Sequence, residues 1–193
     1  MNVYDFDNTI YDGESVLDFY IYCVLRYPKL TKYLFIILFS WAKYKLLLLS
    51  REKLLSLAER YAAEFFRQVK DIESLVSKFW DKKQKKIKSF YLDTHREDDV
   101  VVSASVSFLL EDICRRLSIN HLICSRVDTV TGHVYDLCFR QNKPDYFRER
   151  FPGAKIENFY SDSMNDKPMM LMAENSYLVK GSKIIPIPKK KLK

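Results

Sequence analysis

The chain has 193 residues, of which 48% are hydrophobic and 15% aromatic, with four glycines and six prolines. That length fits one domain, or one domain with a modest insertion, and the composition excludes a disordered, collagen-like or low-complexity chain. The formal net charge of +7 comes largely from lysines at 82–88 and 189–193, which we expect to form a solvated helix face and a chain end, with attraction to anionic lipid or nucleic acid as the alternative.

An apolar segment at the start of the chain leads directly into two carboxylates. Asn2-Val3-Tyr4 precedes Asp5-Phe6-Asp7-Asn8-Thr9. Residues i and i+2 of a strand share a face, so Asp5 and Asp7 are expected to project towards one point. Such carboxylates repel each other unless a cation lies between them, and a hard divalent ion such as Mg2+ suits that position. The pair predicts a metal-assisted site, with turn or capping residues as the plainer alternative.

Residues 15–94 have the pattern of helices only, with Leu, Phe and Tyr at helical spacings and breaks at Pro28 and at 50–52. Within them, residues 33–42 read YLFIILFSWA. This apolar run is shorter than the roughly 20 residues that span a bilayer, so we expect a buried helix of a bundle. The alternative is a helix in a membrane interface, flanked by Lys29, Lys32, Lys43 and Lys45.

After Arg96 short apolar strands alternate with helices. Strands are expected at 100–102, 121–125, 134–139, 156–160 and 177–179, and helices at 108–117, from Pro144, and at 167–173. The alternation predicts an α/β fold with a largely parallel sheet, interrupted after its first strand by the helical stretch. We therefore expect a core formed by residues 1–14 and 95–193, and a helical insertion at 15–94.

Polar residues follow several of these strands. Ser103 follows the 100–102 strand, residues 161–166 (SDSMND) follow the 156–160 strand, and Lys143 begins a helix between them. Open parallel sheets bind ligands at the carboxyl ends of their strands. Acids suit a divalent cation, and Ser and Lys suit an oxyanion, so the set favours phosphoryl transfer. Taken singly, Ser103 fits a helix N-cap, Lys143 a solvated lysine, and the two acids of 161–166 a helix N-terminus.

In combination these residues resemble the four motifs of the haloacid dehalogenase-like (HAD) hydrolases, in family order. Asp5–Thr9 resembles the DxDxT motif, Ser103-Ala104 the second motif, Lys143 the third, and residues 161–166 the fourth. Ser161 and Ser163 stand where the family usually has Gly. The resemblance implies a Rossmann-like, three-layer core with a parallel sheet. An all-helical cap between the first and second motifs is typical of the phosphoserine phosphatase-like branch.

The resemblance also implies a role for each matched residue. Asp5 would be the nucleophile and Asp7 the general acid and base. Mg2+ would be held by Asp5, the Asp7 backbone carbonyl and Asp162, with Asp166 in support. The phosphoryl group would be bound by Ser103, the backbone at Ala104, Lys143 and Asn165, while Thr9 would order the loop. Glu14 is the nearest candidate for the cap-proximal Glu of that branch.

The implied activity is Mg2+-dependent phosphomonoester hydrolysis of a small phosphorylated metabolite through an aspartyl-phosphate. The alternative is a lipid-phosphate phosphatase of the phosphatidylglycerophosphatase C type, with peripheral membrane contact through the cap and a fourth motif that reads YSDS, as residues 160–163 do. A non-catalytic binding module is disfavoured because every catalytic position is filled. No nucleic-acid partner is expected, because no recognised motif supports one.

The cysteines and histidines are predicted to have no part in this chemistry. The chain has no CxxC pair and no metal-ligand spacing, so the four cysteines are expected to be buried thiols. A signal-peptide pattern is absent before Asp5, and with buried thiols this favours a reducing, cytoplasmic location. The three histidines lie outside all the motifs.

Overall fold

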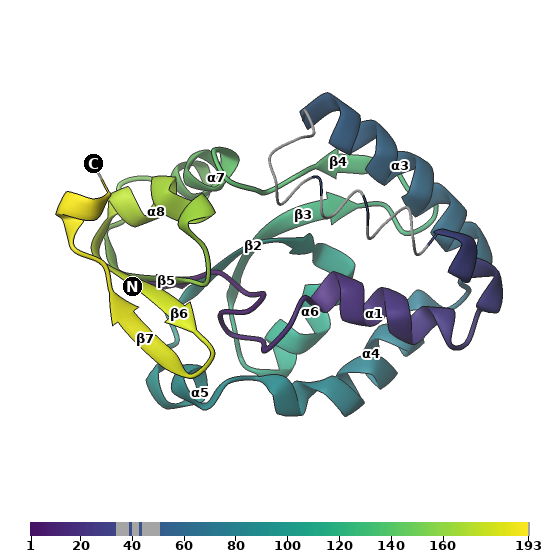
Figure 1. Cartoon of the computed structure of the whole chain (residues 1–193), viewed down its shortest axis with the longest axis horizontal. Helices are drawn as coiled ribbons and strands as arrows, with labels where there is room; N and C mark the ends of the chain where they lie inside the picture. The colour runs from purple at the N-terminus through teal and green to yellow at the C-terminus, as the bar shows by residue number, and fades with distance from the viewer. Residues whose placement is uncertain (34–38, 40–42, 44–50, 193) are drawn as a thin grey trace.

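A computed structural model of the chain describes residues 1–33, 39, 43 and 51–192. Within these residues, seven strands form one sheet in the order β4-β3-β2-β1-β5-β6-β7 (Figure 1). The pairs among β1, β2, β3, β5 and β6 are parallel, while β4 and β7 are antiparallel strands at the two edges. The predicted α/β fold is therefore confirmed. The strands are β1 (Asn2–Tyr4), β2 (Val100–Val106), β3 (His121–Val127), β4 (Val134–Asp136), β5 (Ile156–Ser161), β6 (Ala173–Lys180) and β7 (Lys183–Pro186).

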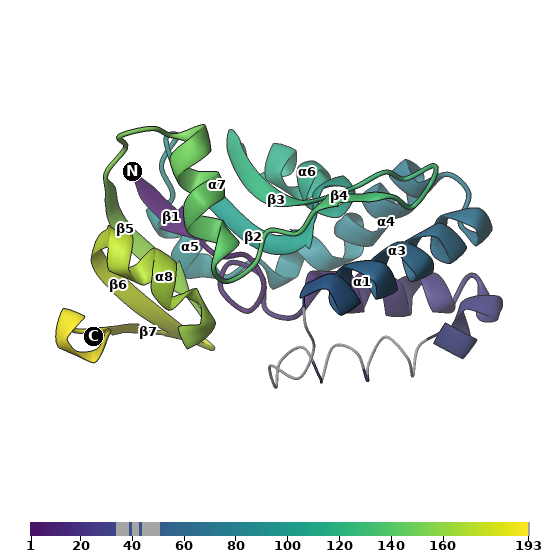
Figure 2. The same ribbon diagram turned by 90° about the horizontal axis from the view of Figure 1, so that it is seen from above.

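Helices cover both faces of the sheet, and the alternation of side chains along β1 and β2 explains why. Tyr4 and Val101 face a core that includes α4 and α6, whereas Val3 and Val102 face a core that includes α7 and α8. This period-two burial on both faces is typical of a central parallel strand. The result is a three-layer arrangement (Figure 2). The helices outside the insertion are α6 (Ser107–Arg116), α7 (Asn142–Arg150) and α8 (Lys167–Met172), with 3-10 turns η3 (Met164–Asp166) and η4 (Lys189–Lys191).

Between β1 and β2 the described residues form only helices, as predicted. They are α1 (Ser15–Val24), η1 (Pro28–Leu30), α3 (Arg51–Gln68), α4 (Ile72–Lys83), η2 (Gln84–Lys86) and α5 (Ser89–Thr94). The two ends of this stretch lie side by side, because the Asp12 N–H donates to the Lys86 carbonyl at 2.9 Å and the Lys88 N–H to the Ile10 carbonyl at 2.8 Å. The division into a core and a cap at residues 14/15 and 94/95 stays a prediction.

Aromatic side chains of α4 and α5 join the insertion to the rest of the chain. Trp80 of α4 donates from its indole nitrogen to the carbonyl oxygen of Leu109 in α6 at 2.8 Å. The ring of Tyr91 in α5 packs edge-on against Tyr4 of β1, with centroids 5.0 Å apart. A buried indole N–H requires an acceptor, so the Trp80 contact fixes the position of α4 on α6.

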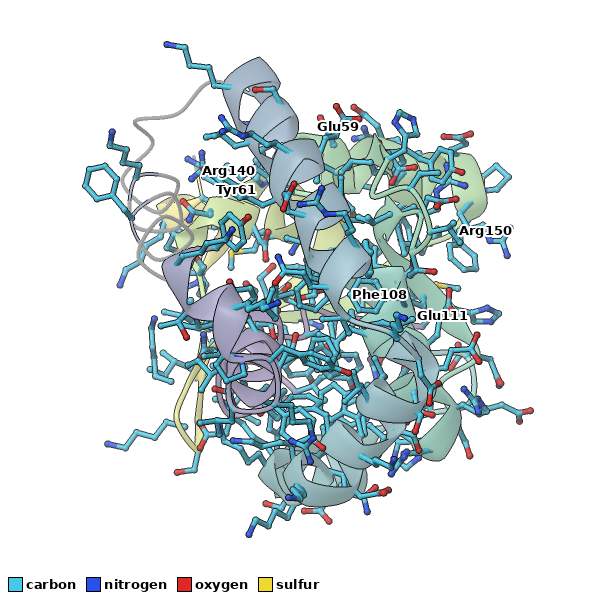
Figure 3. The ribbon with its side chains drawn as sticks, turned by 90° about the vertical axis from the view of Figure 1, so that its right-hand side faces the viewer. Glu59, Tyr61, Phe108, Glu111, Arg140 and Arg150 are labelled. Carbon is cyan, nitrogen blue, oxygen red and sulfur yellow. The ribbon has the colours of Figure 1, made fainter. Side chains whose placement is uncertain are left out.

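A second junction lies at the turn between β3 and β4, which reaches α3. Gly132 there has φ +79°, and a Cβ atom on it would lie 2.2 Å from the backbone nitrogen of Ala63. The next residue, His133, places its Nδ1 3.0 Å from Oε1 of Glu59. Figure 3 shows Glu59 on the side of α3 that faces this hairpin. Only glycine fits so close to a helix backbone.

Several predicted boundaries differ from the structure. The strand expected to end at Ser103 continues to Val106, with an irregularity in its pairing to β3 after Val102. The last predicted strand, 177–179, is the end of the longer β6, and β7 was not predicted. The 33–42 stretch lies almost entirely outside the described residues. In the described part of the chain, no helix combines the length and the apolarity needed to cross a membrane.

Candidate active site

The loop after β1 is anchored by its apolar residues. The Phe6 ring packs against Tyr11 and Trp80, each with centroids 6.1 Å away. The Phe6 carbonyl accepts hydrogen bonds from the N–H groups of Thr9, Ile10 and Tyr11. β1 ends at Tyr4, so the two acids lie in this turn and not on a strand face. The prediction that the two acids share a strand face is therefore wrong, and their convergence on one point stays a prediction.

Asp5 lies in a buried cluster of charged groups. The Lys143 ammonium donates to Asp5 Oδ1 at 2.8 Å and to Asp166 Oδ2 at 3.0 Å. Thr9 Oγ1 donates to the other Asp5 oxygen at 3.4 Å, and Ser161 Oγ donates to Asp166 Oδ2 at 2.8 Å. Lys143 is 3% exposed, and Thr9 is completely buried. The first, third and fourth motifs therefore meet at the Lys143 ammonium.

Asp7 has different hydrogen-bond partners, and both are uncharged groups. The backbone N–H of Ser15, at the start of α1, donates to Asp7 Oδ1 at 2.6 Å. The hydroxyl of Ser105 in β2 donates to Asp7 Oδ2. The two serine hydroxyls are themselves 3.0 Å apart. Asp7 thus connects the loop after β1 to the first helix of the insertion and to the end of β2.

Burial shifts both carboxylates towards the protonated form. Burial raises the pKa of Asp5 to about 8; Lys143 lowers it, and the charges of Asp166 and Asp162 raise it. Burial also raises the pKa of Asp7 to about 6, opposed by the hydrogen bonds from Ser105 and Ser15. For Lys143, burial favours the neutral amine, but the carboxylates of Asp166 and Asp5 outweigh it and raise the pKa. Burial therefore raises the pKa of both acids, but different neighbouring groups oppose it at each one.

The second motif lies beside this cluster but inside the strand. Ser103 is fully buried, and its hydroxyl oxygen accepts a hydrogen bond from the Ser105 N–H at 3.1 Å. Its own O–H can still donate to a ligand. Ala104 is exposed, and its carbonyl accepts from Ser125 Oγ at 2.9 Å. The capping alternative for Ser103 does not apply, because α6 begins at Ser107.

The fourth motif separates into buried and exposed residues. Asp166 is buried against Lys143, whereas Asp162 is half-buried and its backbone carbonyl accepts from Lys180 at 2.7 Å. Asn165 is exposed, and its backbone N–H donates to Ser163 Oγ at 3.1 Å. Among the described residues, no hydrogen bond joins the Asn165 side chain to Asp5 or Lys143. Its phosphate-binding role therefore stays a prediction, as do the other roles implied by the motifs.

Three contacts at the site were not predicted. Ser15 and Ser105 bind Asp7, and the ammonium of Lys88 donates to the backbone carbonyl of Asn8 in the same loop. Asn8 itself has φ +58°, a conformation that Asn adopts more readily than most residues, and its side chain donates to Glu14 at 2.9 Å. The position of Ser105 two residues after the second motif could have suggested it, but nothing in the sequence pointed to Ser15 or Lys88.

The donor set of this site fits a hard divalent cation. Asp5 and Asp166 contact one buried ammonium, Lys143, and the charge of Asp162 acts on Asp5. The excess negative charge calls for a further cation, and all the donors are oxygen atoms, which Mg2+ prefers. Across residues 1–33, 39, 43 and 51–192, no three His, Cys, Asp or Glu side chains gather closely enough to hold a metal ion by themselves. Backbone oxygens, phosphate oxygens or water would have to complete the shell.

The remaining predictions about side-chain chemistry are met in part. Cys23, Cys114 and Cys138 are buried, Cys124 is half-buried, and none of the four forms a disulfide. Burial raises the pKa of the Cys23 thiol to about 12. His133 pairs with Glu59, away from the Asp5 cluster. These thiols are therefore inert core residues.

Three solved structures resemble this one. A protein of unknown function from Bordetella pertussis Tohama I matches with a TM-score of 0.70 and 18% identity, over 88% of this chain and 85% of that one. A phosphoserine phosphohydrolase-like protein from Francisella tularensis subsp. tularensis SCHU S4 matches at 0.55 and 14%, over 91% and 86%. A HAD family hydrolase from Salmonella enterica subsp. enterica serovar Typhi matches at 0.54 and 14%, over 89% and 59%. At these identities the likeness shows the fold.

Comparison with sequences gives the family. No curated protein matches the chain. The model of the haloacid dehalogenase-like hydrolases matches residues 3–171, a range that contains the loop after β1, Ser103, Lys143 and the whole fourth motif. The chain belongs to the haloacid dehalogenase-like hydrolase family.

Proposed function

We propose that the chain is a Mg2+-dependent phosphomonoester hydrolase that acts through an aspartyl-phosphate on a small phosphorylated metabolite. The observation that carries this proposal is the contrast between two neighbouring acids. Asp5 contacts a buried ammonium at 2.8 Å, while Asp7 is held by a hydroxyl and a backbone N–H and has its pKa raised to about 6. Carboxylates in unlike environments are suited to unlike tasks in one reaction.

The first half of the reaction uses Asp5 as nucleophile and Asp7 as acid. A carboxylate oxygen of Asp5 attacks phosphorus, and the bond from phosphorus to the ester oxygen breaks. Asp7 in its protonated form donates its proton to that leaving oxygen. A pKa of about 6 keeps a useful fraction of Asp7 protonated near neutral pH. Lys143 and the hydroxyl of Ser103 would hold the phosphoryl oxygens, and Thr9 would orient Asp5.

The second half reverses the role of Asp7. As a carboxylate, Asp7 takes a proton from water, and the resulting hydroxide attacks phosphorus and displaces Asp5. Inorganic phosphate then leaves, and Asp7 is protonated again for the next cycle. The hydrogen bonds from Ser105 and Ser15 stabilise the carboxylate form that this step needs.

Asp5, the backbone carbonyl of Asp7 and Asp162 would hold the Mg2+ ion, with Asp166 in support through Lys143. When bound, Mg2+ supplies the positive charge that lets an anionic carboxylate approach an anionic phosphate. The raised pKa of Asp5 supports this assignment, because burial and the charges of Asp166 and Asp162 make its carboxylate form unfavourable despite the contact with Lys143. A bound divalent cation would restore the charge balance and keep Asp5 ionised.

Phosphate release tests the proposal. The purified protein should hydrolyse a generic aryl phosphate with Mg2+ present and lose this activity with EDTA. Brief reaction followed by acid quench and mass spectrometry should find the phosphoryl group on the peptide that contains Asp5. Activity that persists in EDTA would refute the metal role, and labelling of another peptide would refute the nucleophile. A panel of phosphorylated metabolites and lysolipid phosphates would then identify the substrate.

The alternative activity at a membrane surface stays a prediction. It rests on the apolar stretch at 33–49, of which the structure describes only Tyr33, Phe39 and Lys43. Flotation with anionic vesicles would test it directly. Protein that remains with the soluble fraction would remove the main support for a lipid substrate.

A further inference from the structure

A cavity of about 330 Å³ lies where the end of the helical insertion meets the turn between β6 and β7. Its lining combines three lysines with hydroxyl groups, a short apolar floor and one acid. The lining residues are Asp12, Lys85, Lys86, Ile87, Lys88, Ser89, Phe90, Gly181 and Ser182. Lys85, Lys86 and Lys88 belong to the lysine run at 82–88. None of these lysines has a role in the proposed reaction.

The lysines of this cavity are unequally neutralised. Lys86 pairs with Asp18 at 2.9 Å, and Lys83, just outside, lies 3.7 Å from the same carboxylate. In the described part of the chain, no ion pair involves Lys85 or Lys88. Asp12 is the one acid in the lining, so positive charge is in excess there. A cavity with hydroxyl donors and surplus ammonium groups is suited to a phosphate-type anion.

The cavity adjoins two segments of the proposed active site, the loop after β1 and the fourth motif. Lys88 donates to the backbone carbonyl of Asn8, and the charges of Asp12 and Asp162 both act on it. Lys180, next to Gly181 in the cavity wall, donates to the carbonyl of Asp162 at 2.7 Å. A ligand in the cavity would therefore lie close to Asn8, in the loop that contains Asp5 and Asp7, and to Asp162 of the fourth motif.

We propose that this cavity is a subsite for a second anionic group of the substrate, with Lys85 and Lys88 as its cations. The substrate class is then a phosphomonoester that carries another phosphate-type group elsewhere in the molecule. The inference rests on the proposed function, because it places the scissile phosphate at Asp5. The alternative is that the cavity binds a separate anion that is not part of the substrate.

Paired substrates test the subsite. An alkanediol bisphosphate is compared with the monophosphate of the same diol, over a series of chain lengths, in the presence of Mg2+. The wild type should favour the bisphosphate in kcat/KM by about 10-fold at the best length, the value of one or two charge-assisted contacts. Lys85→Glu should reduce this ratio to about one or below. Lys190→Glu, the same charge change on the exposed η4 turn, should retain it.

A binding experiment separates failure of the subsite from failure of the proposed function. In Asp5→Asn protein, calorimetry should show tighter binding of the bisphosphate than of the monophosphate, and Lys85→Ala should remove the difference. If neither compound is hydrolysed but this preference persists, the subsite stands and the proposed function falls. Equal hydrolysis of both compounds, with no effect of Lys85, overturns the subsite alone. Inorganic phosphate could also inhibit in a way that depends on Lys85 without competing with the bisphosphate. That result would assign the cavity to a separate anion and overturn the proposal.

Discussion

The surroundings of Asp5 and of Asp7 differ more than their separation of two residues suggests. Asp5 lies among full charges, with Lys143 in contact and Asp166 and Asp162 close enough to act on it. Asp7 lies among dipoles, the Ser105 hydroxyl and the Ser15 backbone N–H. Burial raises the pKa of both acids; the charge of Lys143 opposes it at Asp5, whereas hydrogen bonds from Ser105 and Ser15 oppose it at Asp7. Variants that alter charge and variants that remove a hydroxyl should therefore have separable effects.

The largest effect should follow from replacing the acids themselves. Asp5→Asn removes the proposed nucleophile and should lower the rate of aryl phosphate hydrolysis by at least about 10^4-fold. Asp7→Asn keeps the nucleophile and should lower it by about 10^2- to 10^4-fold, and the aspartyl-phosphate should accumulate, because water is no longer activated. Phosphate release and intact-protein mass spectrometry measure both. Equal residual rates without an accumulated intermediate would contradict the division of roles.

Removing the shared cation should cost folding stability. Lys143→Ala leaves Asp5 and Asp166 buried without their ammonium, and breaking a buried pair in this way costs about 3–5 kcal/mol. Urea unfolding without Mg2+ measures the loss. Lys155→Ala, which removes an exposed lysine, should change the free energy of unfolding by less than about 0.5 kcal/mol. Adding Asp166→Asn to Lys143→Ala should recover part of the loss; if it does not, charge imbalance is not the cause.

The metal-free protein should become less stable as the pH rises from about 4 towards 8. Asp5 has its pKa raised to about 8 and Asp7 to about 6, whereas an unfolded Asp titrates near about 3.9. Over this window the folded state retains protons that the unfolded state releases, so each rise in pH favours unfolding. Asp5→Asn should flatten the decline up to pH 8, and Asp7→Asn only the part below about pH 6. A stability that rises across this window in EDTA would contradict both shifts.

The smallest effect should come from the hydroxyl that binds Asp7. Ser105→Ala removes a donor that stabilises the carboxylate, so the pKa of Asp7 should rise, and the alkaline limb of kcat/KM for an alkyl phosphate should move to higher pH. The rate at neutral pH should fall by about 10-fold, because Asp7 is less well oriented. Ser176→Ala, which removes an equally buried serine bound to the Met170 carbonyl, is the matched control and should leave the profile in place.

The order of the main elements and the meeting of three motifs could be predicted from the sequence, because both depend on local patterns. Apolar strands alternate with helices, and parallel strands place their carboxyl ends at one edge of the sheet. Lys143, Asp5 and Asp166 meet as this argument requires. The prediction for Asp5 and Asp7 applied strand periodicity beyond the end of the strand, since β1 stops at Tyr4 and both acids follow it.

The missed features depend on contacts between distant residues or on edge strands. Ser15 and Ser105 are 90 residues apart, and only the fold brings both to Asp7. β2 continues through Ser103 because Val106 still pairs with Ser125 of β3, although serines are weak strand formers. β7 is exposed along its whole length, so it lacks the alternation of apolar and polar residues by which a half-buried strand is recognised.

The adjacent ends of the helical insertion have a consequence for how such proteins can diversify. Backbone hydrogen bonds from Asp12 to Lys86 and from Lys88 to Ile10 close the excursion at its base. The register of the strands therefore does not depend on how many residues lie between these points. A replacement segment of another length could be inserted there without changing that register. Packing of Phe6 on Trp80 is one constraint, because any new segment must supply an apolar partner for that ring, and the hydrogen bond from the Ser15 N–H to Asp7 is another. Selection could thus exchange the helical segment while Asp5 and Asp7 stay in place at the end of β1.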